Sequence, residues 1–233
     1  MKQNYKSILL FSGGPDSFIA WHYLHRPPAL FINAHQSYAA KELRAVRLLA
    51  RRNRIELHED HSFDLSRWEE KNFYIPYRNV FFSMIGSLYA PTVYLVGIKG
   101  DRVDDNNPQA TKWMSKFYAH FNTHTAVHVT SPFYSMSKSQ IVAWYVRRRL
   151  PLGDLLATRS CYSKATPGQC GACPSCFRRW VAFENNGIKE RYDSPPWEWL
   201  GVTGYIRKMK AGAYDRVRTR ETLNALKKYR DIG

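Results

Sequence analysis

The sequence predicts an α/β fold built on a doubly wound, mostly parallel sheet of five strands. Short apolar runs alternate with longer amphipathic segments along the chain, a pattern typical of parallel strands joined by helices. The first run, residues 7–12, is largely apolar and ends at Gly13 and Gly14, which predicts a strand buried on both faces and then a tight turn. Residues 92–98 form the clearest β-branched run. A sheet of this kind binds its ligands at the carboxyl ends of its strands.

The individual elements follow from local composition and periodicity. Strands are expected at residues 7–12, 29–34, 55–58, 92–98 and 126–130. Helices are expected from about Asp16, at residues 39–53, 79–90 and 109–122, and from a cap at Ser137 to Arg149. In the helix at 39–53, the apolar residues recur on one face, as in a helix that packs on a sheet: Leu43, Val46, Leu49 and Ala50. A polar loop is expected at residues 99–108.

Length and composition fit one main domain with an appendage. With 233 residues and 44% hydrophobic content, the chain can bury a sizeable core. We expect three parts: an α/β domain at 1–150, a metal-binding segment at 151–187 and a basic, helical extension at 188–233. From Pro151 onward, loops and cysteines dominate and no strand pattern continues. In the extension, a helix is expected at about 219–230.

The charge indicates which partners the surface attracts. A formal net charge of +16 favours polyanions such as nucleic acid, nucleotides or acidic proteins. Residues 201–233 hold nine Lys or Arg residues against three acids, so this part is the best local candidate for contacting a polyanion or a partner subunit. The alternative is a solvated basic helix face. No run of about 18 apolar residues and no export-signal pattern occurs. We therefore expect a cytoplasmic protein with no membrane partner.

Residues 12–17 (Ser-Gly-Gly-Pro-Asp-Ser) predict a binding loop for pyrophosphate. The loop follows a buried strand and begins a helix, where backbone amides and the helix dipole favour an anion. Gly13 and Gly14 allow the main chain to approach phosphate oxygens closely. Ser12 and Ser17 can donate hydroxyl hydrogen bonds, and Asp16 can hold Mg²⁺ or order the loop. The longer loop of kinases and motor ATPases is missing, which disfavours phosphoryl transfer.

Four cysteines within sixteen residues predict a metal site: Cys161, Cys170, Cys173 and Cys176. Four thiolates close a tetrahedral zinc shell and leave no open position, so the site is expected to be structural. Arg178 and Arg179 could partly offset the charge of such a complex. An iron–sulfur cluster is the alternative, because similar cysteine spacing occurs there.

Together, the two motifs make the sequence resemble the 7-cyano-7-deazaguanine synthase family, the QueC or ExsB-like members of the N-type ATP pyrophosphatases of the PP-loop superfamily. The resemblance runs from about residue 6 to residue 187. Besides the loop and the cysteines, the matching segments are Pro76-Tyr77-Arg78-Asn79, Val96-Gly97, Ser131-Pro132-Phe133 with Lys138, and Ser160-Cys161-Tyr162.

The resemblance implies a fold, cofactors and a reaction. The fold is that of the adenine nucleotide alpha hydrolases (HUP), in a homodimer that uses ATP, Mg²⁺ and a structural Zn²⁺. In the reaction, ATP adenylates a heterocyclic carboxylate, 7-carboxy-7-deazaguanine or a close analogue, and ammonia displaces AMP to give an amide. A second adenylation drives dehydration to the nitrile preQ0, which serves queuosine biosynthesis. The chain would thus be an ATP-dependent ligase that forms carbon–nitrogen bonds.

The resemblance also suggests roles for single residues. Asn79 and Gly97 join the loop at 12–17 as nucleotide-binding candidates, and Asp16, Ser17, Arg78 and Lys138 are catalytic candidates. His35 is a further catalytic candidate, as a general base or ammonia-handling group, on its own chemistry and not on the resemblance. His35 suits proton transfer because a neutral imidazole exists near pH 7; a polar residue at the mouth of the pocket is the alternative. For Arg78 the alternative is a surface salt bridge, and for Lys138 a solvated amine.

Two departures from the family pattern concern the substrate. Ala34-His35-Gln36-Ser37 stands where the family has Asp-Tyr-Gly-Gln, and residues 107–111 lack the acid and the arginine of the family's Tyr-Pro-Asp-Cys-Arg. Asp101, Asp104 and Asp105 could reach Mg²⁺ or substrate, or form a solvated acidic loop. Two other functions therefore stay open: adenylation of a base in tRNA or DNA, which the positive charge would suit, and a non-catalytic nucleotide-binding zinc module.

Overall fold

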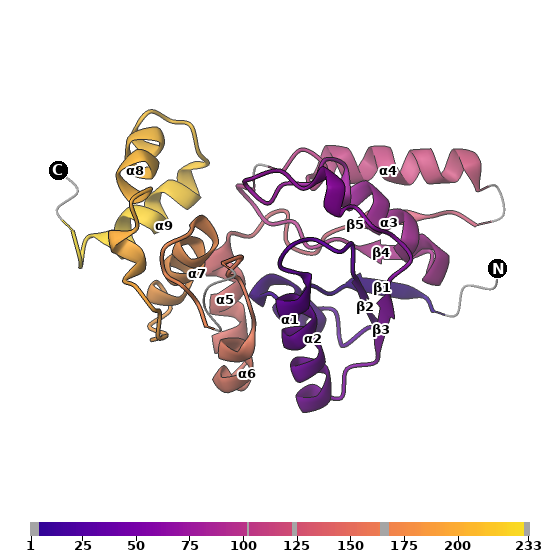
Figure 1. Ribbon diagram of the computed structural model, residues 1–233, viewed down its shortest axis with the longest axis horizontal. Coiled ribbons are helices and arrows are strands. Elements are labelled where there is room, and N and C mark those ends of the chain that lie inside the picture. The colour runs from indigo at the N-terminus through magenta and orange to yellow at the C-terminus, as the bar shows by residue number, and fades with distance from the viewer. Residues whose placement is uncertain (1–4, 102, 123–124, 164–167, 231–233) are drawn as a thin grey trace.

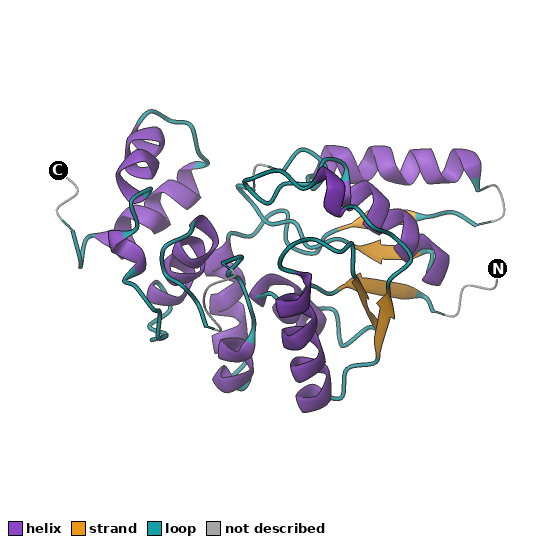
Figure 2. Ribbon diagram, viewed as in Figure 1, coloured by secondary structure: helices purple, strands orange, loops and turns teal. Residues whose placement is uncertain are grey.

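The computed structural model describes residues 5–101, 103–122, 125–163 and 168–230, and it confirms the predicted α/β fold. Five parallel strands form one sheet in the order β3-β2-β1-β4-β5, with helices on both faces (Figures 1 and 2). The strands are β1 (Ser7–Leu10), β2 (Ala29–Ile32), β3 (Leu57–Asp60), β4 (Thr92–Tyr94) and β5 (His128–Thr130). The chain builds outward from β1 in one direction and then in the other, so a switch point lies between β1 and β4.

Both faces of the sheet are buried because successive side chains of a strand point to opposite sides. Leu9 of β1 packs on the face covered by α1 (Pro15–Tyr23), α2 (Ala39–Asn53) and α5 (Lys138–Arg147). Ile8 and Leu10 pack on the opposite face, against α3 (Arg78–Tyr89) and α4 (Pro108–Phe121). The apolar run that predicted β1 is therefore continuous because each of its side chains enters one of two cores.

The region after Pro151 is more helical than the sequence analysis expected. Among the described residues it holds no strand, as predicted, but it forms four α-helices and a short 3₁₀ helix, η2 (Pro196–Glu198). The α-helices are α6 (Leu152–Ala157), α7 (Pro174–Glu184), α8 (Val202–Lys210) and α9 (Arg216–Leu226). The predicted helix at 219–230 thus begins three residues earlier and ends four residues earlier. Residues 231–233 of the predicted extension lie outside the described residues.

Helix α7 connects the sheet domain to the C-terminal helices. Its Phe183 belongs to the core around α1 and α5, whereas its Phe177 and Trp180 pack in an aromatic cluster with α8 and α9. In Figure 1, α7 lies between α5 and this C-terminal pair. The division into three domains remains a prediction.

Several predicted boundaries shift by a few residues for local reasons. Strand β3 lies two residues later than the predicted strand at 55–58, because Arg54 ends α2 in a left-handed conformation and the next residues complete the turn. Regular pairing in β4 ends at Tyr94, although Leu95 still donates a hydrogen bond to Thr130. Helix α4 begins at Pro108 because the Asn107 side chain accepts hydrogen bonds at its N-cap. Residue 102 of the predicted polar loop is not described.

Candidate functional site

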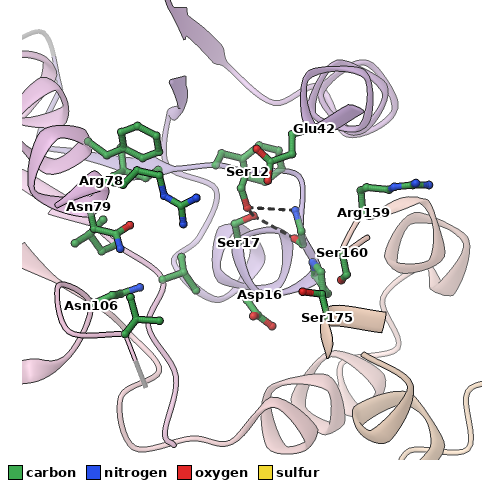
Figure 3. A pocket seen from close by; sticks show the side chains of 18 of the residues that line it. Ser12, Asp16, Ser17, Glu42, Arg78, Asn79, Asn106, Arg159, Ser160 and Ser175 are labelled. Carbon is green, nitrogen blue, oxygen red and sulfur yellow. Dashed lines mark hydrogen bonds between the residues drawn. The ribbon is translucent and has the colours of Figure 1, made fainter. Parts of the chain in front are cut away.

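A cavity of about 290 Å³ opens at the carboxyl ends of β1, β2 and β4. This is the switch point of the sheet, where ligands of doubly wound folds bind. The residues that line it include Leu10 at the end of β1, Ile32 at the end of β2, and Leu95 just beyond β4. Figure 3 shows labelled side chains from the loop after β1, from the first turns of α2 and α3, and from the segment after α6 around this space.

The loop at 12–17 forms one edge of the cavity and keeps binding groups available. Gly13 has a φ of +71°, and a Cβ there would lie 3.0 Å from the Val46 side chain, so glycine is required by both conformation and space. Ser17 donates a hydrogen bond to the Gly14 carbonyl at 3.1 Å. Among the described residues, none accepts a hydrogen bond from the amides of Asp16 or Ser17 at the start of α1. These amides can therefore bind an anion.

One backbone contact ties this loop to the distant cysteine segment. The amide of Arg159 donates a hydrogen bond to the Gly13 carbonyl at 2.8 Å. Arg159 follows α6 and lies two residues before Cys161, and its side chain points away from the loop (Figure 3). The main chain, rather than the guanidinium, therefore holds the loop here.

Two carboxylate–cation pairs line the side of the cavity nearest α5 and α7. The Lys138 amine lies 2.5 Å from Oδ2 of Asp16, and Arg178 pairs with Asp101. Burial lowers the pKa of the Lys138 amine, although Asp16 favours its charged form. Burial alone would raise the pKa of Asp101, but Arg178 holds it below the usual range. Both cations can face an anionic ligand.

Asp16 keeps one carboxylate oxygen for a further partner. Its Oδ1 is buried and has no hydrogen-bond partner among the described residues, whereas Oδ2 is held by Lys138. A buried carboxylate oxygen without a donor fits the ligand set of Mg²⁺, which prefers carboxylates together with phosphate oxygens. Asp16 is the residue that would hold such an ion.

Arg78 reaches the cavity from the first turn of α3. It donates a hydrogen bond to the Tyr38 hydroxyl at 2.5 Å and extends toward Ser12 across the cavity (Figure 3). Burial opposes the charge of Arg78, yet Tyr38, Tyr162 and Glu42 together hold its pKa above the usual value. Neighbouring Asn79 also lines the cavity. Arg78 therefore lies in the cavity wall and not in a surface salt bridge.

Asp105 acts on this site from outside the cavity. Its carboxylate accepts hydrogen bonds from the backbone and side-chain amides of Asn79, at 2.9 and 2.8 Å. Of the three acids in the predicted polar loop, Asp101 lines the cavity, whereas Asp104 and Asp105 do not. Asp105 orders the start of α3 and thereby helps to position Asn79.

The sequence analysis missed Glu42 and Gln36, which lie together in the cavity wall. The Gln36 amide donates a hydrogen bond to Oε2 of Glu42 at 2.9 Å. Burial raises the pKa of Glu42 to about 7, against the opposing effects of Arg78 and this hydrogen bond. A signal did exist: Glu42 is the one acid of α2 and is spaced four and seven residues from the core residues Val46 and Leu49.

Two predicted site residues lie outside the cavity. His35 is exposed, has a φ of +58°, and is not among the residues that line the cavity. Within the part of the chain that the structure describes, no contact supports His35 as a catalytic base. Gly97 is also absent from the lining. A Cβ at Gly97 would lie 2.5 Å from the Tyr134 ring and 2.6 Å from Oδ1 of Asn106, so packing accounts for this glycine.

Replacing Gly97 by alanine should destabilise the fold. The added methyl group overpacks the contact with Tyr134 and Asn106, which typically costs about 1–3 kcal/mol of unfolding free energy. Thermal denaturation should show a melting temperature several degrees lower. The control is Gly204→Ala in α8, where no atom lies within 4 Å of an added Cβ and no loss is expected. Equal stability of both variants would contradict the packing role.

The four cysteines form one compact cluster. Their sulfur atoms all lie within 4.8 Å of one another, and the Sγ atoms of Cys170 and Cys176 are 3.9 Å apart. A tetrahedral zinc site with Zn–S bonds of about 2.3 Å needs sulfur atoms roughly 3.8 Å apart. Cys173 caps α7, where its sulfur accepts a hydrogen bond from the Cys176 amide. The cluster therefore fits the thiolate shell of a zinc ion.

The two arginines after the cluster do not serve as its counter-charges, contrary to expectation. Arg178 points to the cavity and pairs with Asp101. Arg179 is fully buried, and Glu190 holds its guanidinium through two hydrogen bonds of 2.7 and 2.8 Å. Both positive charges are therefore matched by carboxylates elsewhere.

Comparisons with known proteins agree on one family. The family model described as Queuosine biosynthesis protein QueC matches residues 40–187. The 7-cyano-7-deazaguanine synthase of Chlorobium luteolum is 28% identical over 222 residues, which cover 81% of this chain and 96% of that protein. The protein of the same name from Methanosarcina barkeri is 29% identical over 139 residues, or 57% of this chain and 56% of that protein. Within the described residues, no helix is long and apolar enough to span a membrane.

Proposed function

The chain belongs to the QueC family, and on that premise we propose that it is an ATP-dependent ligase of 7-deazaguanine metabolism. Its substrate is 7-carboxy-7-deazaguanine or a close analogue, which it adenylates and then joins to ammonia. The observation that carries this proposal is the loop at 12–17: the amides of Asp16 and Ser17 have no acceptor among the described residues, and the loop borders a cavity that Arg78 and Lys138 also line. Pyrophosphate and AMP are the expected by-products.

The geometry supports cleavage between the α and β phosphates. The amides of Asp16 and Ser17 and the hydroxyl of Ser12 can bind the two phosphates that leave, because they point at the cavity from the start of α1. Lys138, which pairs with Asp16 beside the loop, can add its charge there. When Mg²⁺ is bound at Asp16, it supplies further stabilisation of negative charge. Arg78, across the cavity from Ser12, can balance the charge that develops at the α phosphate.

The same cavity has space and polar groups for the carboxylate substrate. Tyr162 lines the wall beside Arg78, and its ring lies 4.5 Å from that of Tyr38. Aromatic faces suit a planar heterocycle, and a guanidinium suits its carboxylate. In this proposal ammonia attacks the adenylated carboxylate to give the amide, and a second adenylation leads to the nitrile. Zn²⁺ at the four cysteines is structural, and the homodimer remains a prediction.

Incubation with ATP, Mg²⁺, ammonia and 7-carboxy-7-deazaguanine tests the proposal, with mass spectrometry for the amide, the nitrile and AMP. We expect AMP to form only when the carboxylate is present, together with amide or nitrile. The absence of AMP with any heterocyclic carboxylate, despite ATP binding, would instead support a non-catalytic nucleotide-binding zinc module.

A basic groove favours modification of a nucleic acid as a second candidate. The groove has a volume of about 500 Å³, and α2, the end of α6 and the segment after α7 contribute its basic residues: Lys41, Arg44, Arg159, Lys189 and Arg191. Glu190, the one acid among the described residues that line the groove, is already bound to Arg179. Because Arg159 borders both this groove and the cavity, a phosphodiester strand in the groove would lie next to the loop. Adding tRNA or single-stranded DNA to the same assay, in place of the free heterocycle, distinguishes the two functions.

A further inference from the structure

We propose that Glu42 is the proton acceptor for ammonia in this cavity, the role for which the sequence suggested His35. The inference rests on the proposed function, because it concerns the step in which ammonia replaces AMP. Three described carboxylates line the cavity, and they differ in their partners. Asp16 and Asp101 each form an ion pair with a cation, whereas Glu42 has no ion pair among the described residues.

The position of Glu42 suits a proton acceptor. It comes from the first turn of α2 and lies beside Ser12 at the edge of the binding loop (Figure 3). Gln36 fixes Oε2 through its amide, and no partner among the described residues holds Oε1. Gln36 itself is only 4% exposed, so the pair lies within the wall, and the Oε1 of Gln36 has no partner among the described residues. One carboxylate oxygen therefore stays available to a molecule in the cavity.

Among Glu42 and the polar groups that face it, Glu42 is the one whose pKa lies near neutral pH. The described polar groups that face it are Arg78 from α3, Gln36 and Tyr38 before α2, and Tyr162 after α6. Burial raises the pKa of both tyrosines, so they stay protonated, and Arg78 stays charged. Burial places the pKa of Glu42 at about 7, where a carboxylate is basic enough to accept a proton and still partly ionised.

The nitrogen lone pair of ammonia forms a bond to the acyl carbon of the adenylate, and the carbon–oxygen bond to AMP breaks with its electron pair leaving on AMP. The nitrogen then carries one proton too many, and Oε1 of Glu42 accepts it. Acyl adenylate and ammonia thus become amide, AMP and one proton, which Glu42 returns to solvent.

Glu42→Gln tests the proposal, because the amide keeps the shape of the side chain but accepts no proton at neutral pH. Three rates are measured: pyrophosphate exchange into ATP that depends on 7-carboxy-7-deazaguanine, amide formation from ammonia, and hydroxamate formation from hydroxylamine. Hydroxylamine is mostly unprotonated at neutral pH. After it attacks, its protonated nitrogen is a stronger acid than the nitrogen of ammonia and can lose its proton to water, so this reaction depends less on a proton acceptor in the protein. We expect exchange and hydroxamate formation within about twofold of the unmodified protein, and a loss of amide formation of about a hundredfold.

The pH profile supplies a readout that a structural role would not change. At a fixed concentration of free ammonia, amide formation by the unmodified protein should rise with pH through about 7, as Glu42 loses its proton. Glu42→Gln should lack this rise. Glu42→Asp, which keeps the carboxylate on a shorter side chain, should keep the rise at a lower rate. Glu56→Gln, at an exposed site outside the cavity, is the matched control and should match the unmodified protein.

Different outcomes overturn different claims. Unchanged amide formation by Glu42→Gln with intact exchange would overturn the role of Glu42 alone. An equal loss of exchange, amide and hydroxamate would do so too, because it would place Glu42 in substrate or nucleotide binding. Absence of exchange in the unmodified protein would overturn the proposed function, and this inference with it.

Discussion

Replacing Asp16 by asparagine should lower AMP formation by at least about a hundredfold while the protein stays folded. The substitution removes the negative charge whose free oxygen faces the cavity, and with it the expected position of Mg²⁺. Loss of one such electrostatic contact to the reacting charge typically costs 10²- to 10³-fold, or about 3–4 kcal/mol. Steady-state AMP release and ATP binding by calorimetry measure the two effects separately.

The choice of asparagine matters because Asp16 also neutralises Lys138. The Lys138 side chain is only 17% exposed, so alanine at position 16 would leave a largely buried amine without its partner and destabilise the fold. Asparagine keeps an oxygen that can accept a hydrogen bond from Lys138. Asp104→Asn is the matched control, since Asp104 does not line the cavity. Unchanged turnover of Asp16→Asn would contradict the proposed chemistry.

Replacing Cys173 by serine should release the metal and lower the melting temperature. Metal binding to four thiolates contributes to folding, with apparent free energies of about 10–16 kcal/mol for structural zinc in peptides at pH 7. Cys173 also caps α7, so the N-terminus of that helix loses its sulfur acceptor. Elemental analysis for zinc and thermal denaturation check the two expectations. An ultraviolet–visible spectrum excludes or reveals the iron–sulfur alternative.

A neighbouring serine provides the control for this variant. Ala172→Ser adds a hydroxyl in the same turn at an exposed position and leaves all four sulfur atoms in place. It should bind metal and melt like the unmodified protein. A Cys173→Ser protein that melts at the same temperature and retains its zinc would refute a structural site.

The sequence alone predicted those features that depend on a few neighbouring residues. The run at 7–12 predicted β1 and its turn because an apolar strand between two cores and a glycine at positive φ leave few alternatives. The cysteine cluster was predicted for a similar reason, since four thiolates within sixteen residues have few other uses. Arg78 and Lys138 were found through family motifs, and the structure brings both to the cavity.

The features that the sequence did not reveal depend on long-range packing. The spacing of Glu42 from Val46 and Leu49 indicates the buried face of α2, but its place in a cavity wall with Arg78 and Tyr162 depends on segments far away in the sequence. His35 was chosen for its chemistry, but the backbone turns with a positive φ at that residue and leaves it exposed. Gly97 matched a family motif, yet its own neighbours, Tyr134 and Asn106, already require a glycine.

The hydrogen bond from Arg159 to the Gly13 carbonyl has a consequence for synthesis on the ribosome. The loop near the N-terminus emerges early, but the residue that holds its main chain is made almost 150 positions later. A nascent or truncated chain that ends before Arg159 can form the first strands and still lack a fully ordered loop. Binding of ATP should therefore begin late in translation, after the cysteine segment has left the exit tunnel and folded back.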